Sequence, residues 1–483
     1  MKKILFIDLS DYFIYQGNHR PMSMITLPLG LMSLGTFLQS QFDLEVKIIK
    51  SGIDFLTEDE AIEVIASVNF DYIGIRSLSI SADELYQLSH KIKEKFPNLF
   101  LMIGGPHASS AYKDVIENTP ADAVIVGEGE LTLKTLISKL LNNEDYRDLP
   151  GLAVRKDGQC IFNGPGEFIH NLDQLPFPNY ALIDLDKYAN KMNWASVRRK
   201  NALIESSRGC PYSCIFCHNL FGQSLRFRSP RIIFSEMERL HKKLAINDFF
   251  FIDDAFNLNY EVAMELFDKI IDSKIKINLH FTNGLRGDRL DQKFIDKMVE
   301  AGTATVAYAV ETASPRLQRY INKNLNLQKI EENINYSCDR GIMVRLFFMF
   351  GFPTETKAEV EATLLMMKKF KKCLPMFYAT KYYKNTKLYE MAIQEGFSRT
   401  EMEKVESGGY HQIEFCATPL LSPEFMKKIH FRYLTEVLFN KERMQNTIEI
   451  QKKYFSEDEI KDFYSDFLMR DIKNLDSLMS LCR

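Results

Sequence analysis

The chain has 483 residues, of which 46% are hydrophobic and 26% charged, and its formal net charge is −3. This composition is typical of a globular protein and excludes a disordered or fibrous chain, while the length predicts two or three domains. The nearly neutral charge provides no general attraction to nucleic acid or to an anionic membrane.

The N-terminal segment Met1–Asp8 does not predict a secretory signal, because its apolar run stops at Asp8. No stretch of the sequence approaches the length of a membrane-spanning helix. We therefore expect a cytoplasmic protein without a membrane partner.

Residues 1–147 alternate between strand-like and helix-like segments. Strands are expected at 3–8, 45–50, 72–76, 99–104 and 123–127, and helices at 30–41, 82–95 and 131–141. Five strands with crossover helices predict an α/β domain with a Rossmann-like, doubly wound parallel sheet. Ligands bind such sheets at the carboxyl ends of the strands, where glycine-rich turns follow at 104–107 and 127–130.

The pattern loosens over residues 148–194, where Leu175–Pro178 is held extended by its prolines. We interpret this segment as a linker. A second series of strands and helices follows in residues 195–395, with strands expected at 203–206, 249–252, 277–281, 305–310, 344–350 and 377–381. Six such units predict a partial (β/α)6 barrel, whose functional residues would lie at the strand C-termini. Residues 396–483 predict a helical C-terminal region.

The eight cysteines are unevenly distributed. The first 159 residues contain none, and Cys210, Cys214 and Cys217 then fall within eight residues. The others are isolated, which is typical of small buried side chains: Cys160, Cys338, Cys373, Cys416 and Cys482.

The cysteine cluster lies on a loop directly after the first expected barrel strand. Three thiolates spaced C-x3-C-x2-C can converge on one face of a 4Fe–4S cube and leave one iron open for another ligand. A structural zinc site needs a fourth protein ligand, and the adjacent His218 is poorly spaced for that role. The motif therefore predicts an iron–sulfur cluster on Cys210, Cys214 and Cys217.

With Phe216 before its third cysteine, this motif resembles the signature of the radical S-adenosylmethionine (SAM) superfamily. The resemblance implies that the open iron binds SAM and that an electron from the cluster cleaves SAM to a 5′-deoxyadenosyl radical. It continues through segments 251–256, 286–288, 310–314 and 350–356, where Thr354 replaces the usual glycine. The SAM contacts that it implies are Phe216, Asp253, Asp254, Arg286, Glu311, Gly351 and Pro353. Taken singly, Asp254, Arg286 or Glu311 is as consistent with a structural ion pair.

Residues 1–147 and the following linker resemble the cobalamin-binding domain that precedes the barrel in one radical SAM subclass. The cobalamin contacts that this resemblance implies are Leu29, Gly30, Ser77, Ser79, Gly104, Gly105, His107, Gly127, Glu128, Gly129 and Glu130. A structural interpretation stays open, because glycine-rich turns end strands in any Rossmann-like domain. The D-x-H-x-x-G segment that supplies a cobalt ligand elsewhere is absent from Ile7–Tyr12, so cobalamin would bind without a protein histidine, or the domain has lost its cofactor.

The resemblance implies methylation of an unactivated centre as the commoner chemistry. The alternative is radical cyclisation, oxidation or rearrangement, as in the anaerobic porphyrin-ring cyclase with the same domain order. Methylthiotransferases carry a second cluster on three N-terminal cysteines, and the cysteine-free first 159 residues argue strongly against that class. A non-catalytic cobalamin- or cluster-binding sensor is a third possibility, which the intact cysteine motif disfavours.

We expect a small-molecule or peptide substrate, since the charge is balanced and no carrier-recognition domain is recognisable. No C-terminal RNA-binding module is evident, so nucleic acid is not expected as a partner. By resemblance, a flavodoxin- or ferredoxin-type protein would donate the electron. Tyr308, Tyr378 and Tyr382 could lie near the barrel opening, although aromatic residues on barrel strands more often pack in the core.

Overall fold

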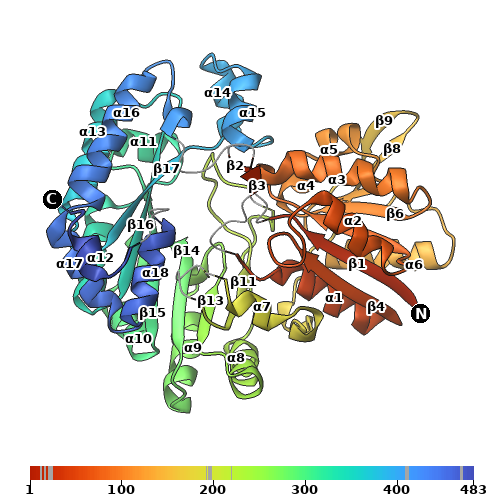
Figure 1. The fold of residues 1–483 in the computed structure, drawn as a ribbon, viewed down its shortest axis with the longest axis horizontal. Helices are drawn as coiled ribbons and strands as arrows, with labels where there is room; N and C mark the ends of the chain where they lie inside the picture. The colour runs from red at the N-terminus through yellow and green to blue at the C-terminus, as the bar shows by residue number, and fades with distance from the viewer. Residues whose placement is uncertain are drawn as a thin grey trace. The chain divides into compact units, whose positions relative to one another are not determined.

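The structure, a computed structural model, describes residues 1–10, 14–15, 18–19, 25–191, 193, 198–218, 220–407, 413–467 and 472–482. The chain forms two compact units. The first contains Met1–Asn190, His218–Gly222 and Tyr383–Asn385, and the second contains Lys191–Cys217, Gln223–Tyr382 and Thr386–Arg483. The ribbon can be followed in Figure 1.

The first unit is built on a seven-stranded sheet of order β4-β1-β5-β6-β7-β8-β9. The first five of these strands are parallel, and β8 and β9 are antiparallel additions at one edge. The strands are β1 (Lys2–Asp8), β4 (Leu44–Lys50), β5 (Tyr72–Arg76), β6 (Phe100–Gly104), β7 (Ala123–Ile125), β8 (Leu152–Lys156) and β9 (Gln159–Phe162); a separate pair joins β2 (Ile14–Tyr15) and β3 (Asn18–His19). The predicted doubly wound, Rossmann-like sheet is thereby confirmed.

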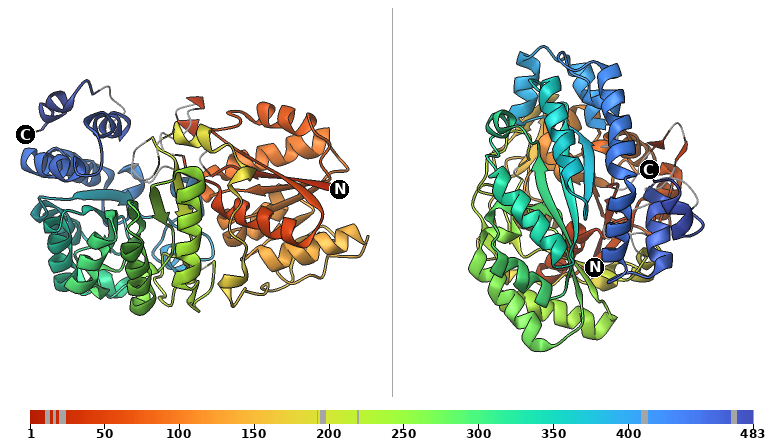
Figure 2. Two further views of the ribbon diagram at one scale, coloured as in Figure 1. Left: turned by 90° about the horizontal axis from the view of Figure 1, so that it is seen from below. Right: turned by 90° about the vertical axis from the view of Figure 1, so that its left-hand side faces the viewer.

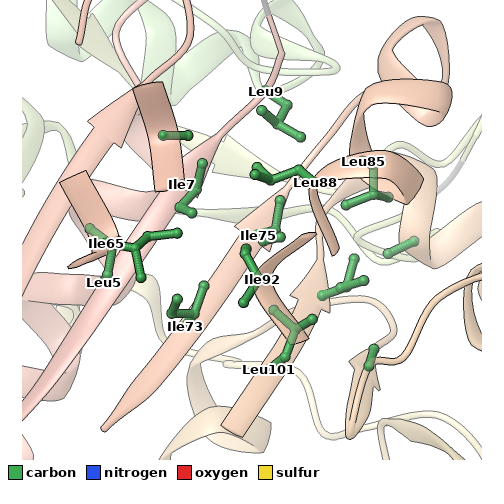
Figure 3. Packing of buried hydrophobic residues seen from close by; sticks show 14 of the residues in the cluster. Leu5, Ile7, Leu9, Ile65, Ile73, Ile75, Leu85, Leu88, Ile92 and Leu101 are labelled. Carbon is green, nitrogen blue, oxygen red and sulfur yellow. The ribbon is translucent and has the colours of Figure 1, made fainter. Parts of the chain in front are cut away.

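Helices cover both faces of this sheet. Helices α1 (Leu29–Gln41) and α6 (Glu130–Leu141) contact each other, and α2 (Glu58–Ala66) contacts α3 (Ala82–Lys95). Figure 3 shows how Ile65 of α2 and Leu85, Leu88 and Ile92 of α3 meet Leu5, Ile7, Ile73, Ile75 and Leu101 of the strands. The remaining short elements are η1 (Ser79–Ser81), α4 (Pro106–Ser110), α5 (Tyr112–Asn118), η2 (Leu172–Gln174), η3 (Tyr180–Leu182) and α7 (Leu185–Ala189).

The predicted linker over 148–194 was wrong in its first part, which forms the β8–β9 hairpin. The two strands are joined by Asp157-Gly158, and both residues have positive φ angles, 49° and 79°. An Asp-Gly pair favours this kind of tight hairpin turn, and the sequence interpretation overlooked it. Trp194, the predicted end of the linker, lies outside the described residues.

The second unit contains a parallel six-stranded sheet of order β10-β13-β14-β15-β16-β17. Its strands are β10 (Asn201–Ile204), β13 (Asp248–Phe251), β14 (Asn278–Leu285), β15 (Thr303–Glu311), β16 (Met343–Phe350) and β17 (Leu374–Ala379). Strands that are neighbours in sequence are neighbours in the sheet, as expected for successive βα units of the predicted partial barrel. A small antiparallel pair, β11 (Ser207–Arg208) and β12 (Arg226–Phe227), flanks the cysteine loop.

Helices follow the barrel strands in turn, and most of them begin at a Ser, Thr, Asn or Asp whose side chain accepts a backbone N–H. They are α8 (Pro230–Leu244), η4 (Phe256–Leu258), α9 (Tyr260–Ser273), η5 (Gly287–Arg289), α10 (Gln292–Glu300), α11 (Pro315–Tyr320), α12 (Leu327–Asp339) and α13 (Lys357–Lys369). Figure 2 shows the green and teal helices of this series, α8 to α12, on one side of the sheet and the dark blue C-terminal helices on the other.

The predicted helical C-terminal region is confirmed for the described residues. It comprises α14 (Lys387–Gln394), α15 (Arg399–Ser407), η6 (Ile413–Cys416), α16 (Pro423–Arg432), the π-helix η7 (Tyr433–Leu438), α17 (Lys441–Gln451), α18 (Glu457–Phe467) and α19 (Leu475–Met479). The Tyr454 hydroxyl donates to the carbonyl of Gly341, 3.0 Å away, beside the start of β16. In the described part of the chain, no helix has the length and apolar character needed to cross a membrane.

Candidate active site

The cysteine loop leaves the C-terminal end of β10 and is fixed at its start by Asp253. Oδ1 of Asp253 accepts hydrogen bonds from the backbone N–H and the hydroxyl of both Ser206 and Ser207. Its Oδ2 has no hydrogen-bond partner among the described residues. Burial raises the pKa of Asp253 to about 7. Because one carboxylate oxygen is committed to the loop, the structure gives Asp253 a clear role in holding this loop.

The turn after α11 contacts the cysteine loop on both sides of Cys214. The backbone N–H of Ile215 donates to the carbonyl of Ile321, 3.1 Å away. The side-chain amide of Asn322 donates to Ser213 at its carbonyl (3.0 Å) and its hydroxyl (2.7 Å). The thiol of Cys214 in turn lies 3.9 Å from the carbonyl of Asn322. The path of the loop on both sides of Cys214 is therefore set by contacts within the protein.

Arg286 holds the same loop from another side. Its guanidinium forms two hydrogen bonds to Asp288, of 3.1 and 3.0 Å, and a third to the carbonyl of Lys323 at 2.9 Å. Its Cζ lies 4.2 Å from the centroid of the Tyr212 ring, a distance typical of a cation–π interaction. Arg286 is thus engaged with protein groups in the described residues, and its predicted contact with SAM stays a prediction.

The three thiols differ in exposure: Cys210 and Cys214 are half-buried and Cys217 is exposed. Desolvation raises the pKa of all three thiols. The charge of Lys323 acts in the opposite direction on each of them. No group of three His, Cys, Asp or Glu side chains in the described ranges is arranged to share one metal ion.

Asp254 follows Asp253 at the C-terminal end of β13 and is exposed. It follows β13, the strand that pairs with β10, from which the cysteine loop leaves. Its negative charge raises the pKa of Cys210 and Cys217. An exposed carboxylate at this strand end is suited to accept hydrogen bonds from an ammonium group.

Glu311 ends β15 and is buried against Lys323. Its Oε1 lies 2.5 Å from the Nζ of Lys323, and both side chains are 7% exposed. The φ angle of Glu311 is +66°, a left-handed conformation that is rare for residues other than Gly, Asn and Asp. Lys323 was missed by the sequence interpretation. The signal that could have identified it is Asn322-Lys323-Asn324, because asparagines at two positions with positive φ mark a tight turn.

Gly351 and Pro353 form a turn after β16, at the same edge of the sheet. The turn is held by Glu355, whose Oε2 accepts from the N–H groups of Gly351 at 2.7 Å and Phe352 at 3.3 Å. Gly351 has φ +94°, and a Cβ there would lie 2.9 Å from the Cα of Cys416. Phe216 lies near this turn, with its ring centroid 6.3 Å from that of Phe352.

Two of the three tyrosines are core residues. The hydroxyl groups of Tyr308 and Tyr382 bond to Ser337 and to the carbonyl of Gly351, respectively, and both residues are fully buried. Tyr378 is half-buried, and its ring packs edge-on against Phe347.

In the first unit, the carboxyl ends of the parallel strands meet in register. Asp8 of β1 pairs with Lys50 of β4 and Arg76 of β5, and Arg76 pairs with Gly104 of β6. Ser77 follows this edge, is fully buried, and its hydroxyl has no hydrogen-bond partner in the described part of the chain. A buried hydroxyl without a partner carries a free-energy cost, which a polar ligand at this edge would relieve.

Other predicted cobalamin residues lie at or next to the same edge. Leu29 is buried at the start of α1, and a Cβ at Gly30 would meet open space. A Cβ at Gly105, whose φ is +91°, would lie 2.7 Å from the Cγ of Arg76, so only glycine fits. His107 is buried, and its two ring nitrogens lie 3.1 Å from the hydroxyl groups of Ser79 and Tyr86. This environment gives Ser79 and His107 partners within the protein.

The turn at Gly127–Glu130 leads from β7 into α6. Oε2 of Glu128 accepts from the backbone N–H of Ile169 at 2.9 Å, and Gly129 is the residue at the N-terminus of the helix. Glu130 is buried in the first helical turn. Glu128 is thus committed in part to holding the following segment, and the cobalamin contacts of these four residues stay predictions.

An ionic network follows β1, in the place where a cobalt-binding histidine is absent. Asp8 lies 3.0 Å from both Lys50 and Arg76, and Lys50 also donates to the hydroxyl of Ser10 at 2.7 Å. Burial alone would raise the pKa of Asp8, but the charges of Lys50 and Arg76 outweigh it and lower this pKa. Asp11 and Tyr12, the end of the segment considered above, lie outside the described residues.

Comparison with known proteins identifies two domain types in the chain. Residues 204–367 match the model of the radical SAM superfamily, and residues 22–137 match that of the B12 binding domain. A relative from Pyrococcus horikoshii, named uncharacterized methyltransferase PH0819, is 31% identical over 370 residues, which cover 76% of this chain and 78% of the relative. The chain belongs to the radical SAM superfamily.

It falls in the part of the radical SAM superfamily that carries a B12 binding domain. Cytidylyl-2-hydroxyethylphosphonate methyltransferase of Streptomyces wedmorensis is 27% identical over 77% of this chain and 79% of its own length. The structure of the radical SAM methyltransferase TsrM from Kitasatospora setae, with tryptophan and a SAM analogue bound, aligns with a TM-score of 0.68 at 18% identity. That alignment covers 82% of this chain and 76% of TsrM and shows a shared fold.

The two domain types of this radical SAM protein imply three cofactors: a 4Fe–4S cluster, SAM and cobalamin. The residues fit these groups. Three cysteines on one anchored loop would supply the thiolates for a cluster with an open iron, and Asp254 ends the neighbouring strand β13. The unpartnered hydroxyl of Ser77, buried at the edge of the first sheet, fits a polar group of cobalamin.

Proposed function

We propose that this protein reductively cleaves SAM to a 5′-deoxyadenosyl radical and uses cobalamin to methylate an unactivated centre of a small-molecule or peptide substrate. The family assignment supports methyl transfer in general terms, and the substrate class follows only from the balanced charge and the absence of a recognisable carrier-recognition domain. A flavodoxin- or ferredoxin-type protein is the proposed electron donor.

The observation that carries this proposal is the anchored cysteine loop. Asn322, Arg286 and Asp253 contact residues on both sides of Cys210, so the loop has a defined path. A loop with this many fixed points is preorganised to receive a cluster with little further ordering cost. Asp254 follows β13, which pairs with the strand that leads into this loop.

Each group of residues has a proposed task. Cys210, Cys214 and Cys217 hold the cluster. Asp254 and Glu311 accept hydrogen bonds from the amino acid part of SAM, and the turn at Gly351–Pro353 with Phe216 bounds the rest of SAM. Asp253 and Arg286 hold the loop. When bound, the cluster with SAM supplies a radical, and cobalamin carries the methyl group.

The N-terminal domain, residues 1–147, is the proposed cobalamin-binding domain, and residues 195–395 form the barrel that binds SAM. Ser77 donates a hydrogen bond to cobalamin, while Leu29, Gly30, Gly104 and Gly105 let it approach the strand ends. The turn formed by Gly127, Glu128, Gly129 and Glu130 forms another part of the proposed cobalamin site. Ser79 and His107 support this edge through their mutual hydrogen bond.

The test is an anaerobic assay of the protein after reconstitution of the cluster, supplied with SAM, reductant and hydroxocobalamin. Both 5′-deoxyadenosine and S-adenosylhomocysteine are quantified, and the cobalamin spectrum is recorded after desalting. We expect both products and retained cobalamin. A Cys214→Ala variant run in parallel should form neither product above background.

The outcomes separate the proposal from its alternatives. Deoxyadenosine without S-adenosylhomocysteine would contradict methylation and favour cyclisation, oxidation or rearrangement. Cofactor binding without any SAM cleavage would favour a sensor. Equal deoxyadenosine from the wild type and Cys214→Ala would contradict the role of the cysteine loop.

A further inference from the structure

Lys323 is a buried lysine within the structure that holds the cysteine loop. It lies between Asn322 and Asn324, which both have positive φ angles, 54° and 50°. Its Nζ lies 2.5 Å from Oε1 of Glu311 and 6.0 Å from the centroid of the Phe216 ring. Phe216 is the residue between Ile215 and Cys217, so the ammonium group lies beside the loop that presents the thiols.

The Lys323–Glu311 ion pair is unfavourable for the free energy of folding. Both side chains are 7% exposed, and burying an ion pair costs desolvation energy that its mutual attraction often fails to recover. Glu311 also has the left-handed φ of +66°, so unfavourable backbone geometry is added to unfavourable burial. A contribution to folding stability does not explain why the buried ion pair and the left-handed Glu311 are present. A functional role for the positive charge of Lys323 does explain them.

The position of Lys323 is fixed through its neighbours. Its carbonyl accepts a hydrogen bond from Arg286, and the preceding carbonyl, of Asn322, lies 3.9 Å from the thiol of Cys214. Arg286 has its own bidentate partner in Asp288, whereas the Nζ of Lys323 has one carboxylate oxygen as its ion-pair partner. The charge of Lys323 acts on all three cysteines. Phe216 packs against an apolar cluster that contains Phe352, and this packing limits screening by water.

We propose that the fixed positive charge of Lys323 raises the reduction potential of the cluster held by Cys210, Cys214 and Cys217. This inference rests on the proposed function. One electron from an external reductant makes the cluster more negative by one charge, and a nearby cation stabilises that form. No bond is formed or broken in this step, and Lys323 keeps its proton.

The test is a redox titration, followed by EPR, of reconstituted protein without SAM, together with its iron and sulfide content. In Lys323→Met we expect the ratio of reduced to oxidised cluster at a fixed potential to fall about tenfold, a shift of about 59 mV to lower potential. Lys323→Arg, which keeps the charge, should restore the potential of the wild type. Lys293→Met, at an exposed lysine of α10, is the matched control and should leave the potential unchanged.

A second variant tests the sign. Glu311→Gln removes the negative partner and leaves the ammonium group, so its cluster should shift to higher potential. If Lys323→Met does not retain its cluster, the reduction potential of Glu311→Gln is the deciding measurement. A potential that falls or does not change in Glu311→Gln would contradict the inference. An iron-loaded Lys323→Met with the potential of the wild type would also contradict it. A wild-type protein that assembles no cluster would instead overturn the proposed function, and this inference with it.

Discussion

The guanidinium of Arg286 lies over the ring of Tyr212, with 4.2 Å between its Cζ and the ring centroid. Tyr212 stands between the first two cysteines of the loop, and Arg286 comes from the end of β14, more than seventy residues later. The contact therefore ties the cysteine loop to the rigid edge of the barrel sheet. A cation–π pair with little exposure to water contributes about 2 kcal/mol.

The first prediction concerns this contact. Arg286→Met keeps an unbranched side chain but removes the charge and the hydrogen bonds to Asp288 and Lys323. We expect the reconstituted variant to lose iron to a chelator about tenfold faster than the wild type, since about 1.4 kcal/mol of loop stabilisation corresponds to that factor. The control is Arg289→Met, at an exposed arginine three residues later in the same segment. Equal rates of iron loss in Arg286→Met and the wild type would contradict a role in holding the loop.

The second prediction concerns Asp254. Asp254→Asn removes the negative charge that raises the pKa of Cys210 and Cys217, with almost no change in shape. If the carboxylate accepts a hydrogen bond from the ammonium group of SAM, equilibrium dialysis with cluster-loaded protein should show about tenfold weaker binding of SAM. Asp272→Asn, at an exposed aspartate of α9, should bind SAM like the wild type. Unchanged affinity in Asp254→Asn would remove Asp254 from the SAM site.

The third prediction concerns cobalamin. Ser77→Ala deletes a buried hydroxyl that has no partner in the described residues, so it costs the free protein little and costs the complex a hydrogen bond. We expect about fivefold to tenfold weaker binding of hydroxocobalamin in a spectroscopic titration, and unchanged thermal stability without cobalamin. The matched control is Ser89→Ala, a buried serine of α3 whose hydroxyl already donates to the carbonyl of Leu85 at 2.6 Å. A loss of stability in Ser77→Ala without weaker binding would indicate a structural serine.

The fourth prediction concerns pH. Burial raises the pKa of Glu355 to about 8, although the N–H groups of Gly351 and Phe352 donate to it. The native protein therefore holds this proton more tightly than the unfolded chain, and its stability falls as the pH rises from the ordinary glutamate range toward 8. Glu355→Gln cannot titrate and still accepts from the two N–H groups.

The melting temperature of Glu355→Gln relative to the wild type should therefore rise between pH 5 and pH 8.5, with a free-energy difference on the order of a few kcal/mol. Glu395→Gln, at an exposed glutamate, should follow the wild type at every pH. A constant difference between Glu355→Gln and the wild type across this range would contradict a protonated Glu355.

The sequence predicted the features that depend on local pattern. Hydrophobic alternation located the eleven parallel strands of the two sheets, and the spacing of Cys210, Cys214 and Cys217 pointed to the cluster loop. The β8–β9 hairpin was missed because its outer strand is only half-buried, so apolar periodicity is weak there, and the Asp157-Gly158 signal was overlooked. Patterns of burial are visible in sequence because they repeat along one element.

The contacts that hold the cysteine loop could not be predicted from the sequence, for a different reason. Asn322 meets Ser213, and Arg286 meets Tyr212, across more than seventy residues of chain. No periodicity records such pairs, because each depends on how several elements end at one edge of a sheet. For the same reason, the sequence did not distinguish Asp253, which holds the loop, from Asp254, whose charge raises the pKa of two of the thiols.

The first unit includes two short pieces from later in the chain, His218–Gly222 and Tyr383–Asn385. The ammonium group of Lys384 lies 2.5 Å from Asp114, and Asn385 donates to the carbonyl of Ser110. One of these pieces begins at the residue after Cys217, and the other follows the last barrel strand by a few residues. Residues 1–190 are thus an incomplete version of the first unit. A gene fusion or recombination event that exchanged residues 1–190 alone would bring in an incomplete first unit. The other eight residues of that unit, 218–222 and 383–385, would still come from the protein that receives the exchanged segment.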